Sequence, residues 1–193
     1  MRGPLLSGPL GSAACLDAIV RWVGAASANP GAPSPSPVRP VLLSGPLWLG
    51  ETLAQALPVL MLVEGDDRPG VRRARRRAGR ANHRLEIALA GAELPLRPRS
   101  LATLVIENAA GLDAEPAQAW LNALAPLLAP GGRLIAADAT ASVSAMARVA
   151  EAFLAASLVD IVQERPREGV VLTVGRAPAA AIMAARFPMR AGA

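Results

Sequence analysis

The sequence contains almost none of the residues from which metal and redox sites are usually built. Its 193 residues include one cysteine, Cys15, and one histidine, His83. Cys15 has no second cysteine for an internal disulfide and no metal-ligand residue beside it. These absences exclude a His/Cys metal site, so we expect no bound metal. They also exclude a Ser-His-Asp triad unless His83 supplies its base.

Aromatic residues, lysine and long apolar runs are also scarce. Tyrosine is absent and aromatic residues make up 3% of the chain, so the core must be built from Ala, Leu and Val. No run approaches the ~20 apolar residues that a membrane span needs. The first 14 residues are interrupted by proline and glycine, which is a poor pattern for a signal peptide. We therefore expect a cytoplasmic protein.

What the chain does have is a regular alternation of short apolar runs and helical segments. Apolar residues make up 52% of the sequence, which is enough for one buried core in a domain of this length. Strand–helix alternation is typical of βαβ units, which form parallel sheets covered by helices. Strands buried on both faces should be continuously apolar, as these runs are. The expected strands are 41–44, 59–63, 85–89, 101–106, 134–137, 158–162 and 170–174.

The last two apolar runs predict a different connection. They flank a polar turn that contains Pro166 and Gly169, which is typical of an antiparallel hairpin. The sequence therefore predicts an α/β fold: a three-layer, doubly wound, mostly parallel seven-stranded sheet that ends in a C-terminal antiparallel hairpin.

The N-terminal region differs in composition from the rest. Leu16, Ile19, Val20 and Val23 recur at helical spacing, and five prolines follow in residues 29–40, which predicts a stiff linker. The helix could cover the domain or bind a partner. We expect four regions: a helical extension (1–28), a Pro-rich linker (29–40), the main domain (41–176) and an Ala-rich tail (177–193).

Two motifs point to a known family. The segment LLAPGGRLI at residues 127–135 has a proline that stops a helix and two glycines that allow a sharp turn onto the next strand. Leu94-Pro95-Leu96, followed by the apolar run 104–106, is the second motif. On these motifs, residues 40 to about 176 resemble the class I methyltransferases, which use S-adenosylmethionine.

The resemblance implies a cofactor site after the first two strands. Glu64 ends the second strand, where a carboxylate of the family accepts both ribose hydroxyls, and Asp66 and Asp67 are alternatives for this role. Gly45 matches the first glycine of the family's G-x-G-x-G loop, in which backbone must approach the cofactor closely. Leu47 and Leu49 stand at the other two glycine positions, and Gly50 follows one residue late.

Further cofactor and catalytic positions follow the third and fourth strands. Glu93 is the nearest replacement for the acid that receives the adenine amino group in the family. Glu107, Asn108 and Asp138 end strands and should converge with Glu64 on one crevice, because ligands of parallel α/β sheets bind at the carboxyl ends of strands. Methyl transfer needs alignment of the reacting atoms and, for some acceptors, a general base. We assign that role to Glu107 and cofactor contact to Asn108.

The sequence is compatible with two functions. The first is an S-adenosylmethionine-dependent methyltransferase that acts on a small molecule. A nucleic-acid amino methylase is argued against, because its N/D-P-P-Y/F motif is replaced by residues 107–110 and tyrosine is absent. The second function is a catalytically inactive, methyltransferase-like binding or assembly module. The leucines in the glycine loop favour it, as do Ala90 and Thr103, which replace two acids of the family pattern.

An arginine cluster is the remaining motif. Six charges fall within nine residues of one expected helix, a density that suits contacts with phosphate groups of RNA or with an acidic partner. No aromatic residue interleaves, so stacking on bases is not expected. The alternative is a solvated face that balances the acids at 64, 66 and 67. The cluster consists of Arg72, Arg73, Arg75, Arg76, Arg77 and Arg80.

Overall fold

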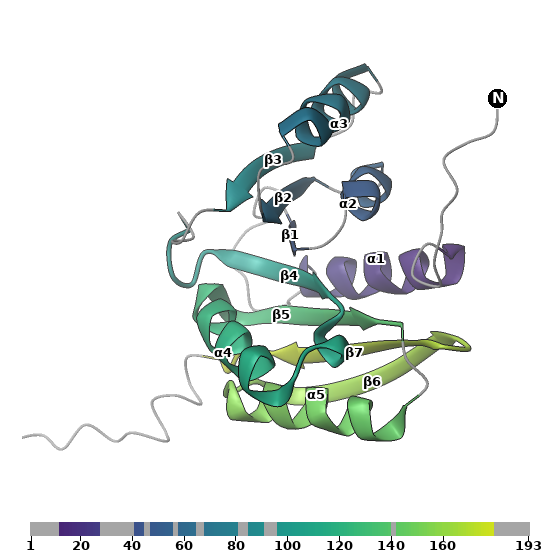
Figure 1. The fold of residues 1–193 in the computed structure, drawn as a ribbon. Helices are drawn as coiled ribbons and strands as arrows, with labels where there is room; N and C mark the ends of the chain where they lie inside the picture. Colours follow the sequence, from purple (N-terminus) through teal and green to yellow (C-terminus); the bar gives the residue numbers. More distant parts are fainter. Residues whose placement is uncertain are drawn as a thin grey trace, which may run out of the picture.

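Seven strands form one mixed sheet through the protein (Figure 1). The computed structural model describes residues 12–27, 41–44, 47–55, 58–64, 68–80, 85–90, 96–139 and 142–179. The strands lie in the order β3-β2-β1-β4-β5-β7-β6. β1 to β5 are parallel, whereas β7 pairs antiparallel with both β5 and β6. The predicted α/β fold with a mixed sheet is confirmed.

The strand bounds agree with the apolar runs to within a few residues, except for the fifth and sixth strands. The sixth runs to Arg167, so Pro166 lies in that strand and not, as expected from the sequence, in the turn. The strands are β1 (Val41–Ser44), β2 (Val59–Glu64), β3 (Leu85–Ala90), β4 (Leu101–Glu107), β5 (Leu128–Asp138), β6 (Val159–Arg167) and β7 (Val170–Arg176).

Helices cover both faces of the sheet. The helices are α1 (Ala13–Ser27), α2 (Leu47–Leu53), α3 (Arg68–Arg80), α4 (Ala114–Leu124) and α5 (Val143–Ala155), with short 3-10 turns η2 (Ala109–Gly111) and η3 (Ala125–Leu127). Residues of α1, α2 and α3 share one buried cluster, and residues of α4 and α5 share the other. Within the described ranges, no helix combines the length and apolarity that crossing a bilayer requires.

The central strands send alternate side chains into the two clusters. Val105 and Ile135 pack with α1 and α2, whereas Leu104 and Leu134 pack with α4 and α5. All four side chains are fully buried. Successive side chains of a strand point to opposite faces, so a strand covered on both faces must be apolar at every position. This explains why the runs are continuous rather than alternating.

α1 is packed onto the sheet. Cys15, Ile19 and Val23 are buried in the first cluster, and the helix contacts β4, β5 and β6. Of the two roles considered for this helix, the structure shows that it covers the domain.

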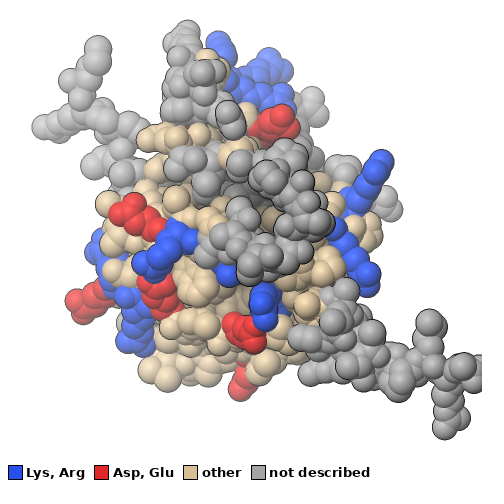
Figure 2. All heavy atoms as spheres, turned by 180° about the vertical axis from the view of Figure 1, so that it is seen from behind, with Lys and Arg blue, Asp and Glu red and all other residues tan. Residues whose placement is uncertain are grey.

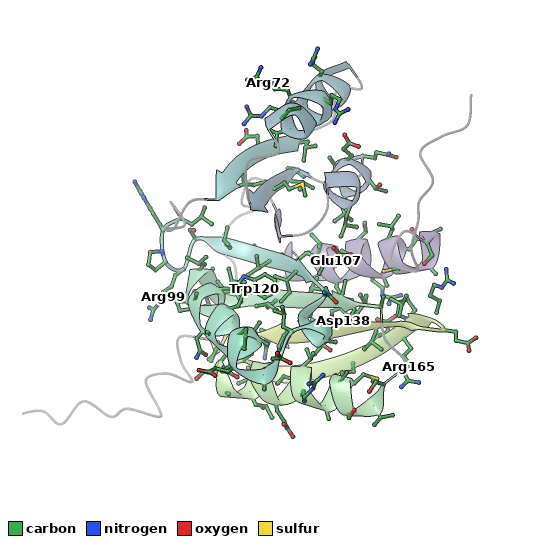
Figure 3. The ribbon with its side chains drawn as sticks, viewed as in Figure 1. Arg72, Arg99, Glu107, Trp120, Asp138 and Arg165 are labelled. Carbon is green, nitrogen blue, oxygen red and sulfur yellow. The ribbon has the colours of Figure 1, made fainter. Side chains whose placement is uncertain are left out.

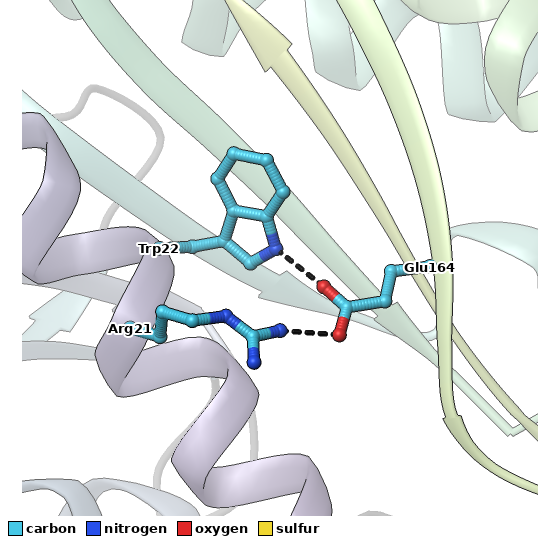
Figure 4. A network of polar contacts seen from close by, with 3 residues as sticks. All are labelled: Arg21, Trp22 and Glu164. Atoms are coloured by element: carbon cyan, nitrogen blue, oxygen red, sulfur yellow. Dashed lines mark hydrogen bonds and ion pairs between the residues drawn. The ribbon is translucent and has the colours of Figure 1, made fainter.

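Polar contacts at the side of α1 fix it against β5 and β6. The Trp22 indole N–H donates to Glu164 Oε2 at 2.9 Å, and Arg21 forms an ion pair with the same carboxylate (Figure 4). From β5, Arg133 donates to the Trp22 carbonyl at 2.8 Å, and its guanidinium lies 5.3 Å from the centre of the Trp22 ring. These bonds hold the helix to two strands that lie far along the chain.

The Pro-Gly-Gly turn has a different shape from the one expected. Pro130 does not stop a helix, because α4 already ends at Leu124 and Pro130 lies inside β5. β5 begins at Leu128, six residues earlier than predicted, because Leu128 pairs with Leu101 and both glycines exchange backbone hydrogen bonds with Ala177. An apolar run cannot reveal strand pairing that passes through glycine and proline.

Each glycine of the turn has its own structural requirement. Gly131 has φ of 76°, a conformation that glycine adopts at little cost. A Cβ on Gly132 would lie 2.8 Å from the Ala129 carbonyl oxygen and 2.9 Å from the Leu101 carbonyl oxygen. These neighbours are backbone atoms, which cannot rotate away. Gly132 is therefore required because backbone carbonyl oxygens lie too close to it to leave room for a side chain.

Gly132→Ala should destabilise the protein. The added methyl group must displace strand backbone, and overpacking of this kind costs about 1–3 kcal/mol. Gly24→Ala is the matched control, because a Cβ on this exposed position of α1 meets nothing within 4 Å. It should raise the free energy of unfolding by about 0.5–1 kcal/mol. Urea unfolding of both variants measures the difference, and equal stabilities would contradict the assignment.

Removal of Glu164 should loosen α1. Glu164→Ala deletes both acceptor bonds and should lower the free energy of unfolding by about 1–2 kcal/mol. Glu164→Gln keeps an acceptor for Trp22 and should cost less, about 0.5 kcal/mol, because exposed ion pairs contribute little. The hydrogen bond from Arg21 lowers the pKa of Glu164. Its contribution should therefore be present at neutral pH and be lost as the pH falls through that lowered value.

Urea unfolding between pH 3 and pH 7 tests this dependence. Glu151→Ala, on the exposed side of α5, is the control. If the difference between the wild type and Glu164→Ala did not shrink toward acid pH, the role of the carboxylate charge would be wrong.

Candidate functional site

The sheet has one position at which the winding reverses. β1 pairs with β2 on one side and with β4 on the other. The helix after β1, α2, belongs to one buried cluster, and the helix after β4, α4, belongs to the other. Connections that leave on opposite faces open a crevice at the carboxyl ends of the two strands, and ligands of such sheets bind there. The strand ends at this edge are therefore the candidate site.

The predicted cofactor residues are only partly within the described chain. Gly45 and Glu93 lie outside the described residues. Glu64 is the last residue of β2 and pairs with Ala90 of β3, and only its backbone is described. Gly50 lies inside α2, where it is buried and its carbonyl accepts a hydrogen bond from the Ala54 N–H at 2.9 Å. The structure thus places Gly50 within a helix rather than in a loop.

Glu107 and Asn108 lie at the end of β4, as the sequence indicates. Glu107 is half-buried and pairs with Ala137 of β5. Asn108 is exposed and left-handed, with φ of 62°, and its N–H donates to the Ala137 carbonyl at 3.1 Å. Asparagine tolerates this conformation better than most residues. Its side chain fills the space beside Gly111, where a Cβ would collide with it. The chain turns here into η2.

Asp138, at the end of β5, is the buried carboxylate of the site. It is 2% exposed, and its Oδ1 accepts a hydrogen bond from the Ala110 N–H at 2.7 Å. Burial raises the pKa of Asp138 to about 6, although the bond from Ala110 acts in the opposite direction. Asp138 therefore ties η2 to β5. The sequence placed it at this edge only as one of several strand ends, because burial cannot be read from a strand-end position.

Glu107 and Asp138 act as a pair. Both lie at the same end of neighbouring strands (Figure 3). Burial raises the pKa of Glu107, and the nearby charge of Asp138 raises it further. A carboxyl group beside a second carboxylate is harder to ionise. The pair can take up and release a proton closer to neutral pH than an exposed carboxylate can.

Pocket size does not identify the site. One pocket, of about 490 Å³, is lined by Arg99, Leu128 and Ser157, at the amino end of β5 and away from Glu107. A smaller groove of about 190 Å³ runs between α4 and α5 and begins at Ala109 and Ala110. Among the described residues, no group of three His, Cys, Asp or Glu side chains could hold a metal ion. The site rests on topology and on the carboxylate pair.

Solved structures of other proteins share this topology. The chain aligns with PigF bound to SAH at a TM-score of 0.57 and 12% identity, over 72% of this chain and 50% of that chain. It aligns with magnesium protoporphyrin IX methyltransferase (ChlM) of Synechocystis PCC 6803, also with SAH, at a TM-score of 0.59 and 16% identity, over 84% and 81% of the two chains. This chain has the class I methyltransferase fold.

The methyltransferase fold includes proteins with other chemistry. The [4+2]-cyclase SpnF aligns at a TM-score of 0.62 and 11% identity, over 85% of this chain and 81% of SpnF. The sequence matches no family model and no curated protein sequence. The chain also spans only half the length of the PigF chain that it matches. At these identities the alignments establish the methyltransferase fold, and chemistry must be argued from the site.

The raised pKa of Asp138 predicts a pH-dependent stability. The unfolded carboxyl ionises near 3.8 and the folded one near 6. The free energy of unfolding should therefore fall as the pH rises from 4 to 7, by up to about 3 kcal/mol at about 1.4 kcal/mol per pKa unit. Asp138→Asn keeps an acceptor for the Ala110 N–H and removes this pH-dependent contribution, because an amide does not ionise.

Urea unfolding at several pH values measures the difference between the wild type and Asp138→Asn. The variant should gain stability relative to the wild type as the pH rises. Asp113→Asn, at an exposed carboxylate, controls for the loss of one charge. A constant difference across this pH range would show that Asp138 ionises as it does in the unfolded chain.

Proposed function

We propose that this protein is an S-adenosylmethionine-dependent methyltransferase that acts on a small molecule, with Glu107 as its general base. The observation that carries the proposal is the position of Glu107 at the end of β4, where the winding of the sheet reverses. There its pKa is raised by burial and by Asp138. A base with a raised pKa at the ligand edge of the sheet suits an acceptor that must lose a proton.

In this proposal, the residue that follows β1 and the residue that ends β2 would hold the cofactor. Ser44, the last residue of β1, pairs with Leu62, so Glu64 lies two residues beyond the end of β1. A carboxylate at this position suits the two ribose hydroxyls, and Gly45, which follows β1 in the sequence, is the residue at which backbone would approach the methionine part. When bound, S-adenosylmethionine supplies the electrophilic methyl group. In this proposal Glu64 orients the nucleoside, and Gly45 admits the methionine part.

The other residues of the edge prepare the acceptor. Glu107 takes up the proton that an acceptor hydroxyl or amine loses as it attacks. Asp138 assists in two ways: its charge raises the pKa of Glu107, and its bond to Ala110 fixes the turn that follows β4. Asn108 is exposed on that turn, and its side chain lies beside Gly111. Removal of Asp138 should therefore alter both the pH profile and the position of the base.

A small acceptor is favoured by the related structures and by the strand-end segment. ChlM is described as acting on magnesium protoporphyrin IX, which is a small molecule. Residues 107–110 read Glu-Asn-Ala-Ala, without the aromatic residue with which amino methylases of nucleic acid hold an extruded base. The segment therefore offers no stacking surface at the strand end.

Glu107→Gln tests the proposed base. It should reduce kcat about 10²-fold or more, because general bases typically contribute 10² to 10⁴. It should leave the affinity for S-adenosylmethionine unchanged. Glu64→Gln should weaken cofactor binding instead. Calorimetric titration with S-adenosylmethionine and S-adenosylhomocysteine measures affinity, and transfer of a labelled methyl group to a panel of small hydroxyl and amine acceptors measures activity.

Controls separate the roles in this experiment. Glu115→Gln, at an exposed position in the first turn of α4, should change neither affinity nor rate. No binding of either cofactor form up to millimolar concentration would contradict the proposed function. Binding together with full activity in Glu107→Gln would leave the methyltransferase and reject the base.

A further inference from the structure

α3 carries a concentration of positive charge that the proposed methyl transfer does not use. Its 13 residues, RPGVRRARRRAGR, include seven arginines and no acid. Val71 is buried against the core, whereas Arg72, Arg73 and Arg76 are exposed. Like charges three and four residues apart on a helix repel each other. The helix is therefore held in place by its buried side while its outer side is electrostatically unfavourable.

Three of these arginines converge on one place. Arg72, Arg73 and Arg76, together with Pro69, line an open hollow on α3. The Arg76 Nε–H donates to the Arg72 carbonyl at 3.3 Å, which keeps the Arg76 guanidinium close to its own helix. In the described part of the chain, no carboxylate pairs with any of these three side chains. Their charge is left to be balanced by an external anion.

The spacing and chemistry of the hollow suit phosphate groups in a row. Arg72 and Arg76 are about 6 Å apart along the helix axis at about 1.5 Å per residue. Successive phosphates of one DNA strand advance by about 3.4 Å along the duplex axis, so this interval covers two phosphates. Guanidinium groups bind phosphate oxygens through paired N–H donors, which makes arginine better suited than lysine to this contact.

We propose that the outer side of α3, centred on Arg72, Arg73 and Arg76, binds the phosphate backbone of duplex nucleic acid without regard to sequence. In Figure 2 blue side chains gather at the top of the molecule, where Figure 1 places α3. Figure 3 places Arg72 on the outer side of this helix, far from Arg99 and Arg165. The arginines of α3 thus form a group of their own, apart from the other arginines that Figure 2 shows elsewhere on this face.

The composition of α3 favours a duplex over other polyanions. The helix has no aromatic residue on which an unpaired base could stack, so it offers single strands no extra contact. It also lacks an exposed large apolar residue that could enter a lipid bilayer, which membrane-surface helices normally use. A duplex presents two regular rows of phosphates, and this density of charge is what an all-arginine surface can use.

Fluorescence anisotropy with a labelled 20-base-pair DNA duplex, from 20 to 300 mM KCl and without cofactor, tests the proposal. Log affinity should fall linearly with log salt. The triple variant Arg72→Gln, Arg73→Gln, Arg76→Gln should lose about 3 units of that slope, at about 0.9 per phosphate contact. The matched control, Arg97→Gln, Arg99→Gln, Arg165→Gln, removes the same charge elsewhere and should change the slope by less than 1 unit.

Each outcome decides the proposal. Circular dichroism and urea unfolding should show that both triple variants are folded, and the α3 variant should be at least as stable as the wild type because repulsion is removed. Absence of duplex binding at 20 mM KCl overturns the proposal, and so do equal losses in the two variants. Tighter binding to a single strand, or to phosphatidylserine vesicles, overturns it in favour of that partner. Because no cofactor is present, failure here is distinct from failure of methyl transfer.

Discussion

The central strands β4 and β5 are covered by helices on both faces, and the rest of the structure depends on this constraint. A strand that is buried on both sides has no room for charge along its length. The described buried polar side chains are Thr103, Asp138 and Thr173, and of these only Asp138 carries a charge. It lies at the last position of β5. Among the described residues, the one fully buried ionisable side chain of this sheet therefore lies at a strand end.

The same constraint explains the properties of the carboxylate pair. A strand end at the edge of a closed core is partly dry, so burial raises the pKa of Glu107 and of Asp138. Asp138 accepts a hydrogen bond from one backbone N–H, that of Ala110, and this bond also ties the turn after β4 to β5. One buried side chain thus joins the electrostatics of the site to its geometry. The methyltransferase fold provides the edge, and these residues decide what it can do.

The charged side chains beside α1 have partners within the protein, whereas no described carboxylate pairs with those of the α3 hollow. Arg21, Trp22 and Arg133 place their polar groups against Glu164 and the backbone, which holds α1 to the sheet. The arginines of the α3 hollow have no such partner among the described residues. The first set is explained by folding stability, whereas the second is not. This contrast is what makes α3 a surface for a partner rather than a further example of a solvated helix.

The sequence by itself determined the α/β fold, the approximate strand positions and the place of Glu107, because continuous apolar runs and strand-end polar residues follow from local patterns. The sequence did not predict the early start of β5, because the strand there passes through Pro130, Gly131 and Gly132, which do not form an apolar run. Only the tertiary structure decided that α1 covers the sheet and that Asp138 is buried beside Glu107. Burial and the interaction between charges depend on segments that are far apart in the chain, and a local sequence pattern does not show which of these segments meet.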